Sequence, residues 1–244
     1  MLGKGMHLID KSWIKRNLAV IRDLSRTNSL VFGRMAFFIY MLRKPRGNSF
    51  VFQGKTYEYF YHPYNFTWTN DRAIEIPIVW DIVKNYKGKR ILEIGNVLSY
   101  YFPVNHEIVD KYERTQGVIN CDILDFKSPH KYDLIISIST LEHIGWDEPE
   151  EREPMKTLNV IRKLKNMLLP GGKIIITFPV GCNPYLDKLF RDDKISFTKT
   201  YYMKRISKDN RWVETTWHDI CNMNFESDRF FKHSNGLVIG IIEA

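Results

Sequence analysis

Residues 90–101 read RILEIGNVLSYY, and this stretch decides the fold. An apolar run suited to a buried β-strand leads into Gly95, which is the only glycine of the loop that follows. A dinucleotide-binding loop needs further glycines, because its backbone amides must come close to a pyrophosphate. Val97 and Ser99 stand where those glycines would be. The loop therefore disfavours a pyrophosphate, whereas a ligand without phosphates needs only Gly95 close to it.

Apolar runs alternate with helical patterns on both sides of this strand. Helices are expected over residues 71–86 and 154–168, and the second has acidic residues before it and basic residues near its end, as the helix dipole favours. Continuous apolar strands joined by helices are typical of a parallel sheet covered on both faces. The expected strands are residues 90–96, 106–112, 117–123, 132–139 and 173–180.

The pattern changes after Pro184. Strand-like runs follow at residues 200–207, 211–217 and 236–244 without a helical pattern between them, so the sheet is expected to end in antiparallel pairs. The predicted fold is an α/β, doubly wound, mostly parallel seven-stranded sheet with antiparallel C-terminal strands. An N-terminal helical and hairpin extension precedes it.

Composition places the chain among globular proteins. Its 244 residues, 44% of them apolar, suffice for one sizeable core. Cys121, Cys182 and Cys221 show no paired spacing, which argues against a disulfide framework or a zinc site and favours a reducing compartment. No signal-peptide pattern is seen, and the longest apolar run, residues 30–42, is too short to cross a bilayer.

The positive charge of the chain is concentrated in residues 1–49. This segment holds ten basic and two acidic residues, whereas the remainder holds 26 of each. Residues 11–26 fit a helix with one apolar and one basic face, which is typical of a membrane-surface helix. We therefore expect a cytoplasmic protein that binds peripherally to the inner membrane face. A helix that packs on the body of the protein or on a second subunit has the same pattern.

Residues 50–70 combine a β-hairpin pattern around Gly54 with an aromatic-rich stretch. These aromatic side chains fit either a lid that stacks on a sugar or a hairpin that packs on the core. They are Tyr59, Tyr61, Tyr64, Phe66 and Trp68. We divide the chain into the basic extension 1–49, the hairpin or lid 50–70 and the α/β domain 71–244.

Polar residues follow the predicted strands at the sheet edge where such folds bind ligands. Asp110 comes 17 residues after Glu93, about the spacing at which a carboxylate accepts hydrogen bonds from ribose hydroxyls. Asp122 ends the next strand, where it is placed to face an adenine, and the fourth strand runs into Ser139. A single acidic residue at a strand end is more often a turn residue or a helix cap. Their common register favours a binding crevice.

With these residues the sequence resembles class I S-adenosylmethionine-dependent methyltransferases. The resemblance covers roughly residues 66–244 and rests on ILEIGN, IVDKYE, VINCDILDF, YDLIISISTLEHIG and LKNMLLPGGKIIITFPVG. It implies a Rossmann-like fold, S-adenosylmethionine as the cofactor and methyl transfer as the reaction. With its aromatic hairpin, the whole chain resembles the members of this family that act in surface-glycan biosynthesis, which implies O-methylation of a sugar or glycolipid precursor.

The resemblance also implies a role for each cofactor-binding residue. The assigned residues are Glu93, Gly95 and Asn96 at the methionine portion, Asp110 at the ribose, Asp122 with Ile123 along the adenine, and Ser139 near the methyl group. Val97 and Ser99 replace the family's glycines, so the sequence does not fix the path of the loop. It also leaves open that the chain is a relative that has lost activity.

Methyl transfer to a hydroxyl requires alignment of the acceptor and removal of its proton. His143 is the leading candidate for the base, because its unperturbed pKa is close to neutral. Glu142 is either an alternative base or the group that orients the imidazole. The same pair could also merely shape a turn, with Glu142 capping a helix.

Two further groups of residues near the predicted crevice have competing interpretations. Arg72 and Glu75 either border the amino-acid end of the cofactor or form an exposed helix pair. A set of metal-ligand types could hold Mg²⁺, but such acids more often belong to a solvated loop, and we expect no metal. This set is Glu142, His143, Asp147 and Glu148.

The alternatives to a glycan methyltransferase are an RNA or protein methyltransferase and an inactive methyltransferase-like binding module. The concentration of charge in residues 1–49 argues against nucleic acid as a partner of the body. A dehydrogenase is disfavoured because the glycines of a dinucleotide loop are missing. The expected partner is a small-molecule or glycan acceptor, and the sequence leaves the oligomeric state open.

Overall fold

The computed structural model describes residues 48–147, 152–227 and 232–244. The predicted N-terminal extension therefore lies outside the described residues, apart from Asn48 and Ser49. The chain divides into two compact units, one of Met1–Arg46 and His62–Phe66 and the other of Gly47–Tyr61 and Thr67–Ala244. The second unit, called the body below, contains the predicted sheet.

Within the described residues, the body holds one sheet of eight strands in the order β5-β4-β3-β6-β7-β12-β8-β9. Its strands are β3 (Ile91–Ile94), β4 (Glu107–Val109), β5 (Val118–Ile119), β6 (Tyr132–Ile138), β7 (Leu168–Pro179), β8 (Lys199–Arg205), β9 (Trp212–Thr215) and β12 (Gly236–Glu243). Two short strand pairs stand apart from it: β1 (Ser49–Phe52) with β2 (Lys55–Glu58), and β10 (Glu226–Ser227) with β11 (Lys232–His233).

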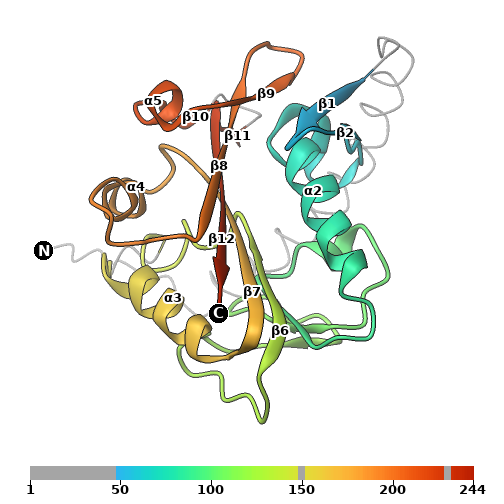
Figure 1. Ribbon diagram of the computed structural model, residues 1–244, viewed down its shortest axis with the longest axis vertical. Coiled ribbons are helices and arrows are strands. Elements are labelled where there is room, and N and C mark those ends of the chain that lie inside the picture. Colours follow the sequence, from blue (N-terminus) through green and yellow to red (C-terminus); the bar gives the residue numbers. More distant parts are fainter. Residues whose placement is uncertain (1–47, 148–151, 228–231) are drawn as a thin grey trace, which may run out of the picture. The chain divides into compact units, whose positions relative to one another are not determined.

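The described helices flank this sheet. They are α2 (Arg72–Asn85), α3 (Lys156–Asn166), α4 (Pro184–Arg191) and α5 (Trp217–Ile220), together with the 3₁₀ turns η1 (Tyr64–Thr69) and η2 (Leu98–Tyr100). In Figure 1 the sheet is seen nearly edge-on, with α3 and α4 on one side and α2 on the other. No helix among the described residues is both long enough and apolar enough to cross a membrane.

The strand order places a switch point at β3. From β3 the chain adds β4 and then β5 on one side, and it then returns to add β6 and β7 on the other side, all of them in parallel pairs. Strand β12 runs antiparallel to both β7 and β8, and β8 pairs antiparallel with β9. A crevice is expected where the chain reverses its direction of growth, beyond the carboxyl ends of β3 and β6.

Burial on both faces explains why the central strands form at all. Leu134, Ile135 and Ile136 of β6 are fully buried, although consecutive strand residues point to opposite faces. Ile135 belongs to the core beneath α3, and Leu134 and Ile136 belong to the core beneath α2. The central sheet is therefore covered by apolar side chains on both sides, as its continuous apolar runs predict.

The predicted fold class is confirmed, with three differences in detail. The eighth strand, β9, extends the sheet beyond β8 at its edge. The three strands predicted after Pro184 are present as β8, β9 and β12 in antiparallel pairs, but α5 lies between β9 and β12, where we expected no helix. Helix α4 precedes these strands and is not among the predicted helices. Asn183 begins α4: its side-chain oxygen accepts hydrogen bonds from Tyr185 N–H (2.9 Å) and Leu186 N–H (3.1 Å).

The predicted hairpin is present, and its aromatic side chains pack into the core of the body. Strands β1 and β2 are joined by Gln53 and Gly54, both with positive φ. Phe50 and Tyr59 are buried in a cluster that includes Trp212 of β9. Tyr59 and its neighbour Trp68 are at most 8% exposed, so these two are core residues and no lid. Tyr64 and Phe66 belong to the other compact unit.

Candidate functional site

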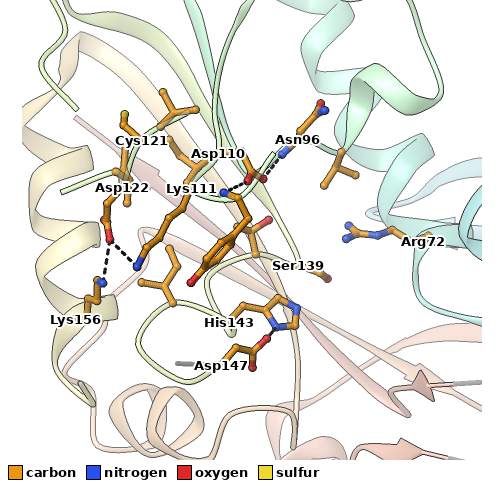
Figure 2. Close-up of a pocket in the computed structure, with 18 residues that line it drawn as sticks. Arg72, Asn96, Asp110, Lys111, Cys121, Asp122, Ser139, His143, Asp147 and Lys156 are labelled. Atoms are coloured by element: carbon orange, nitrogen blue, oxygen red, sulfur yellow. Dashed lines mark hydrogen bonds and ion pairs between the residues drawn. The ribbon is translucent and has the colours of Figure 1, made fainter. Parts of the chain in front are cut away.

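A cavity of about 390 Å³ lies at the predicted switch point. The loops after β3, β4, β5 and β6 contribute to its wall, as do the first residues of α2 and α3 (Figure 2). Its volume falls within the range of small-molecule sites. The lining residues used below are Arg72, Gly95, Asn96, Asp110, Lys111, Asp122, Ser139, Thr140, His143, Asp147 and Lys156.

The backbone amides of the loop after β3 are all engaged within the protein. Gly95 N–H donates to the carbonyl of Val109 (2.9 Å), and Asn96 N–H donates to Asp110 Oδ2 (3.1 Å). Val97 N–H and Leu98 N–H both donate to Glu93 Oε1, at 2.9 and 2.8 Å. Four consecutive amides are therefore occupied, which leaves none of them to cradle a phosphate.

Glu93 organises this loop from behind and does not line the cavity. It is fully buried, and its second oxygen, Oε2, lies 2.7 Å from His106 Nε2. A buried carboxylate is stable only where charged or polar partners surround it. The predicted direct contact of Glu93 with a ligand is therefore not supported, because both of its oxygens face protein groups.

Gly95 is required for its conformation and for the space beside it. Its φ is +83°, and a Cβ atom there would lie 2.3 Å from Thr140 Oγ1. The adjacent Asn96 accepts a hydrogen bond from the Ser99 hydroxyl, whereas its Nδ2 is buried without a partner. An unsatisfied buried donor beside a cavity is suited to a ligand that brings an acceptor.

Asp110 keeps its carboxylate at the cavity wall. Oδ1 accepts hydrogen bonds from Tyr112 N–H and Glu113 N–H, both at 2.8 Å, and Oδ2 accepts the one from Asn96. Figure 2 shows the contact between Asp110 and Asn96 as a dashed line. Because a carboxylate has about four acceptor positions, Asp110 retains capacity for a ligand hydroxyl.

Two lysines converge on Asp122 at another part of the cavity (Figure 2). Asp122 Oδ2 lies 2.9 Å from Lys156 Nζ and 3.4 Å from Lys111 Nζ. Burial alone would raise the pKa of Asp122, but the hydrogen bonds from Leu124 N–H and Lys156 lower it below its usual value. The side chain of Lys156 is only 10% exposed and begins α3, where the helix dipole disfavours a cation. The ion pair with Asp122 accounts for the burial of this lysine.

Arg72 and Glu75 join α2 to the strand end at Ser139. Arg72 Nη1 donates to the carbonyl of Ile138 (3.0 Å) and lies 3.3 Å from Glu75 Oε2, while Ser139 Oγ donates to Glu75 Oε1 (2.5 Å). Glu75 is fully buried, so the interpretation as an exposed helix pair is wrong. Ser139 has a φ of +38°, a strained value for a residue with a side chain.

Further carboxyl groups surround Arg72. Burial, with a contribution from the charge of Glu75, raises the pKa of Asp71 to about 7. Glu142 is 1% exposed, its Oε2 has no hydrogen-bond partner, and burial raises its pKa well above the usual range. One arginine therefore faces more carboxyl groups than it can neutralise, and the protein holds the excess as protonated acids.

His143 lies at the mouth of the cavity, and its side chain is 50% exposed. Asp147 Oδ2 is 2.8 Å from His143 Nδ1, whereas Glu142 Oε1 is 3.7 Å from His143 Nε2. Asp147 is therefore the carboxylate that orients the ring. Glu142 is too buried to act on a substrate, and it is not among the lining residues.

The structure brings most of the predicted site residues together. Seven of them line the cavity: Gly95, Asn96, Asp110, Asp122, Ile123, Ser139 and His143. Glu93 and Glu142 lie behind it. Thr140, which follows the predicted fourth strand, lines it too. Lys111 and Lys156 also line it and are not among the predicted residues, although Lys156 carries a signal, a cation at a helix start. Among the described residues, no group of three or more acids, histidines or cysteines could hold a metal ion; Glu148 lies outside them.

Comparison with known proteins adds only a likeness of fold. No protein-family model matches the sequence, and no curated protein matches it. The N-methyltransferase NodS from Bradyrhizobium japonicum, in complex with S-adenosyl-L-homocysteine, has a TM-score of 0.39 at 12% identity, over 72% of this chain and 93% of that one. TehB from Haemophilus influenzae has a TM-score of 0.37 at 14% identity, over 67% of this chain and 61% of that one. The CcbJ methyltransferase from Streptomyces caelestis has a TM-score of 0.36 at 9% identity, over 68% of this chain and 88% of that one.

The raised pKa of Asp71 predicts a pH-dependent stability. Between about pH 4 and pH 7 the folded protein retains a proton that the unfolded chain releases, so the stability of the protein falls as the pH rises through this range. Asp71→Asn removes this loss. We expect the free energy of unfolding of the variant, relative to that of the unmodified chain, to rise by about 1–3 kcal/mol from pH 4.5 to pH 8, as measured by urea unfolding.

The matched control for this prediction is Asp209→Asn, which changes an exposed carboxylate. The difference in unfolding free energy between this control variant and the unmodified chain should stay nearly constant over the same pH range. If Asp71→Asn behaved like this control, the Asp71 carboxyl would be ionised in the folded protein, and the account of protonated acids around Arg72 would be wrong.

Proposed function

We propose that the chain is a methyltransferase that uses S-adenosylmethionine. The observation that carries this proposal is the loop after β3, whose four consecutive amides are occupied within the protein while the cavity beside it stays open. A dinucleotide would need those amides for its pyrophosphate. An adenosyl ligand without phosphates needs only the close approach that Gly95 permits.

The residues present fit this cofactor. Asp110 would accept hydrogen bonds from ribose hydroxyls, and Asp122 would accept one from the adenine amino group, with Ile123 along the ring. Lys156 would hold Asp122 in place. At the other end, the unpartnered Nδ2 of Asn96 and the guanidinium of Arg72 would hold the amino-acid carboxylate.

S-adenosylmethionine supplies a methyl group on a good leaving group, so the protein must align the acceptor and remove its proton. In the proposed reaction His143 accepts that proton at Nε2. Asp147 holds Nδ1–H at 2.8 Å and stabilises the imidazolium that forms. The partial exposure of His143 lets a large acceptor reach the ring from solvent and lets the proton leave.

A hydroxyl of a sugar or glycolipid precursor is the proposed acceptor. A neutral hydroxyl needs the base that His143 provides. Three residues after His143, the ring of Trp146 lies edge to face with that of Tyr185, with centroids 5.5 Å apart. Arg152 covers the Trp146 ring, whereas Tyr185 is 39% exposed and could pack on the apolar face of a sugar ring.

We also propose that residues 1–49 bring the enzyme to the cytoplasmic membrane face. This proposal is supported by the charge of the segment and by the two-faced pattern of residues 11–26. A precursor attached to a lipid would be presented at that surface. RNA or protein as the acceptor is the alternative, in which the same basic segment would contact phosphates.

Calorimetric titration with S-adenosylhomocysteine tests the cofactor. Gly95→Ala should weaken binding tenfold or more, because a Cβ would collide with Thr140. Gly117→Ala is the matched control: its φ is +87°, but nothing lies within 4 Å of a Cβ there, so it shares the backbone strain without the collision. If the unmodified chain does not bind the ligand, the protein is a binding module of another kind.

Kinetic analysis tests the base. His143→Gln should lower kcat about 100-fold, while leaving the affinity for S-adenosylhomocysteine within a few-fold. Asp147→Asn should lower kcat about tenfold, because it orients the base only. Methyl transfer to a set of nucleotide sugars is the assay. Equal loss for His130→Gln, which is not among the residues that line the cavity, would contradict a specific role of His143.

Vesicle sedimentation tests the membrane proposal. Deletion of residues 1–46 leaves β1 intact and should release the protein from vesicles that contain anionic lipid. Neutral vesicles should bind neither form. Unchanged sedimentation after the deletion would refute the proposal, and binding of RNA that weakens steeply with salt would favour the alternative acceptor.

A further inference from the structure

A second cavity, of about 410 Å³, lies beside the C-terminal end of α2. It is as large as the first, but its wall comes from other parts of the chain: the last turns of α2, the residues that lead into β3, and the segment between η2 and β4. The lining residues used below are Trp80, Lys84, Tyr86, Lys87, Lys89 and His106.

Lysines give this cavity a positive charge. Lys84, Lys87 and Lys89 line it, and no acidic side chain is among its lining residues. Lysines at the end of a helix often compensate its dipole. Here the turn itself satisfies part of that end, because Tyr86 N–H donates to Val83 O (2.9 Å) and Lys89 N–H to Tyr86 O (3.0 Å). The ammonium group of Lys84 lies 3.7 Å from Asp81 Oδ1, and the exposed side chains of Lys87 and Lys89 can reach an anion in the cavity.

The cavity also has a flat apolar wall. The ring of Trp80 stacks on Phe102, with the centroids 4.1 Å apart and the planes within 6°. Pro103 and Val104 continue this surface. A stacked indole is held rigidly and can pack against a planar ligand. Together the wall and the lysines suit a small molecule with a planar body and a phosphate.

The innermost lining residue connects this cavity to the first one. His106 lines the cavity with a side chain only 4% exposed, and its Nε2 lies 2.7 Å from Glu93 Oε2. The other oxygen of Glu93 accepts the amide hydrogen bonds of Val97 and Leu98. Two contacts therefore lead from the second cavity to the loop that borders the first.

We propose that the second cavity binds a small organic phosphate and that its occupancy stabilises the loop after β3. A ligand seated against the His106 ring restricts the ring, and with it the contact of Nε2 with Glu93 Oε2 at 2.7 Å. Glu93 in turn holds the amides of Val97 and Leu98. By linkage, a ligand that is bound in the first cavity through the same loop binds more tightly. The phosphate site itself does not depend on which ligand the first cavity takes.

Calorimetry of the full chain with phenyl phosphate tests the site. Lys84→Gln/Lys87→Gln/Lys89→Gln should weaken binding tenfold or more. The control, Lys127→Gln/Lys131→Gln/Lys208→Gln, removes the same charge from exposed positions elsewhere and should bind as the unmodified chain does. Phenol and inorganic phosphate should each bind more weakly than phenyl phosphate, because each lacks one half of the ligand. Equal affinity of the two triple variants, or no binding by the unmodified chain, would overturn the proposal.

Two readouts test the connection. Saturating phenyl phosphate should tighten S-adenosylhomocysteine binding several-fold and slow hydrogen exchange at the Val97 and Leu98 amides. His106→Gln should retain phenyl phosphate binding within a few-fold and lose both effects. The exchange measurement needs no ligand in the first cavity, so it remains decisive if the proposed cofactor fails to bind. Displacement of S-adenosylhomocysteine by phenyl phosphate would place the anion in the first cavity and refute a second site. Preferential binding of anionic vesicles through the three lysines would refute a small-molecule site.

Discussion

The buried carboxylate of Glu93 is the interaction on which the candidate site depends. It sits on β3 in the centre of the sheet, where neither oxygen reaches solvent. One oxygen receives two amide hydrogen bonds from the loop and the other faces His106, so both oxygens have polar partners and the loop is fixed by the same contacts. A glycine-rich loop would be shaped by its ligand's phosphates. This loop is shaped by the protein, and it therefore presents a preformed wall to the cavity.

The sequence predicts the sheet well because strands that are buried on both faces consist of nearly continuous apolar residues. In β6 the apolar residues Leu134, Ile135, Ile136 and Ile138 are all buried, and the end of this pattern marks where the loop begins. Asp110 directly follows β4 and Asp122 lies three residues after β5, and both line the cavity because parallel strands bring their carboxyl ends to one edge. Helix α4 is not predicted, although Asn183 and Pro184 form a recognisable helix start. The helix has only eight residues, so its apolar periodicity is too short to stand out beside the strand-like runs that follow it.

The sequence could not predict contacts that depend on how the layers pack. From their place in the motifs, Glu93 is expected to contact the cofactor and Glu142 to act on the substrate or on His143. In the structure both side chains point into the protein interior and are buried. Conversely, Asp147 reaches His143 and Lys156 reaches Asp122 only once α3 and the loop after β6 are positioned against the sheet. Side chains four residues apart can meet in a turn, but a pair separated by 34 positions is invisible without the fold.

Several residues at the crevice break the rules that the rest of the fold obeys. Ser139 adopts a strained backbone angle, Lys156 starts a helix with the wrong charge, and Glu142 buries an oxygen without a partner. Each is unfavourable for folding, and these three lie at or directly behind one cavity. Similar features occur elsewhere in the described residues, such as the positive φ of Asn210 and the unpartnered oxygen of Asp187. Unfavourable features persist where surrounding structure supports them and where a ligand uses them. What sets the crevice apart is that three different kinds of unfavourable feature border one open cavity, which supports a binding site there.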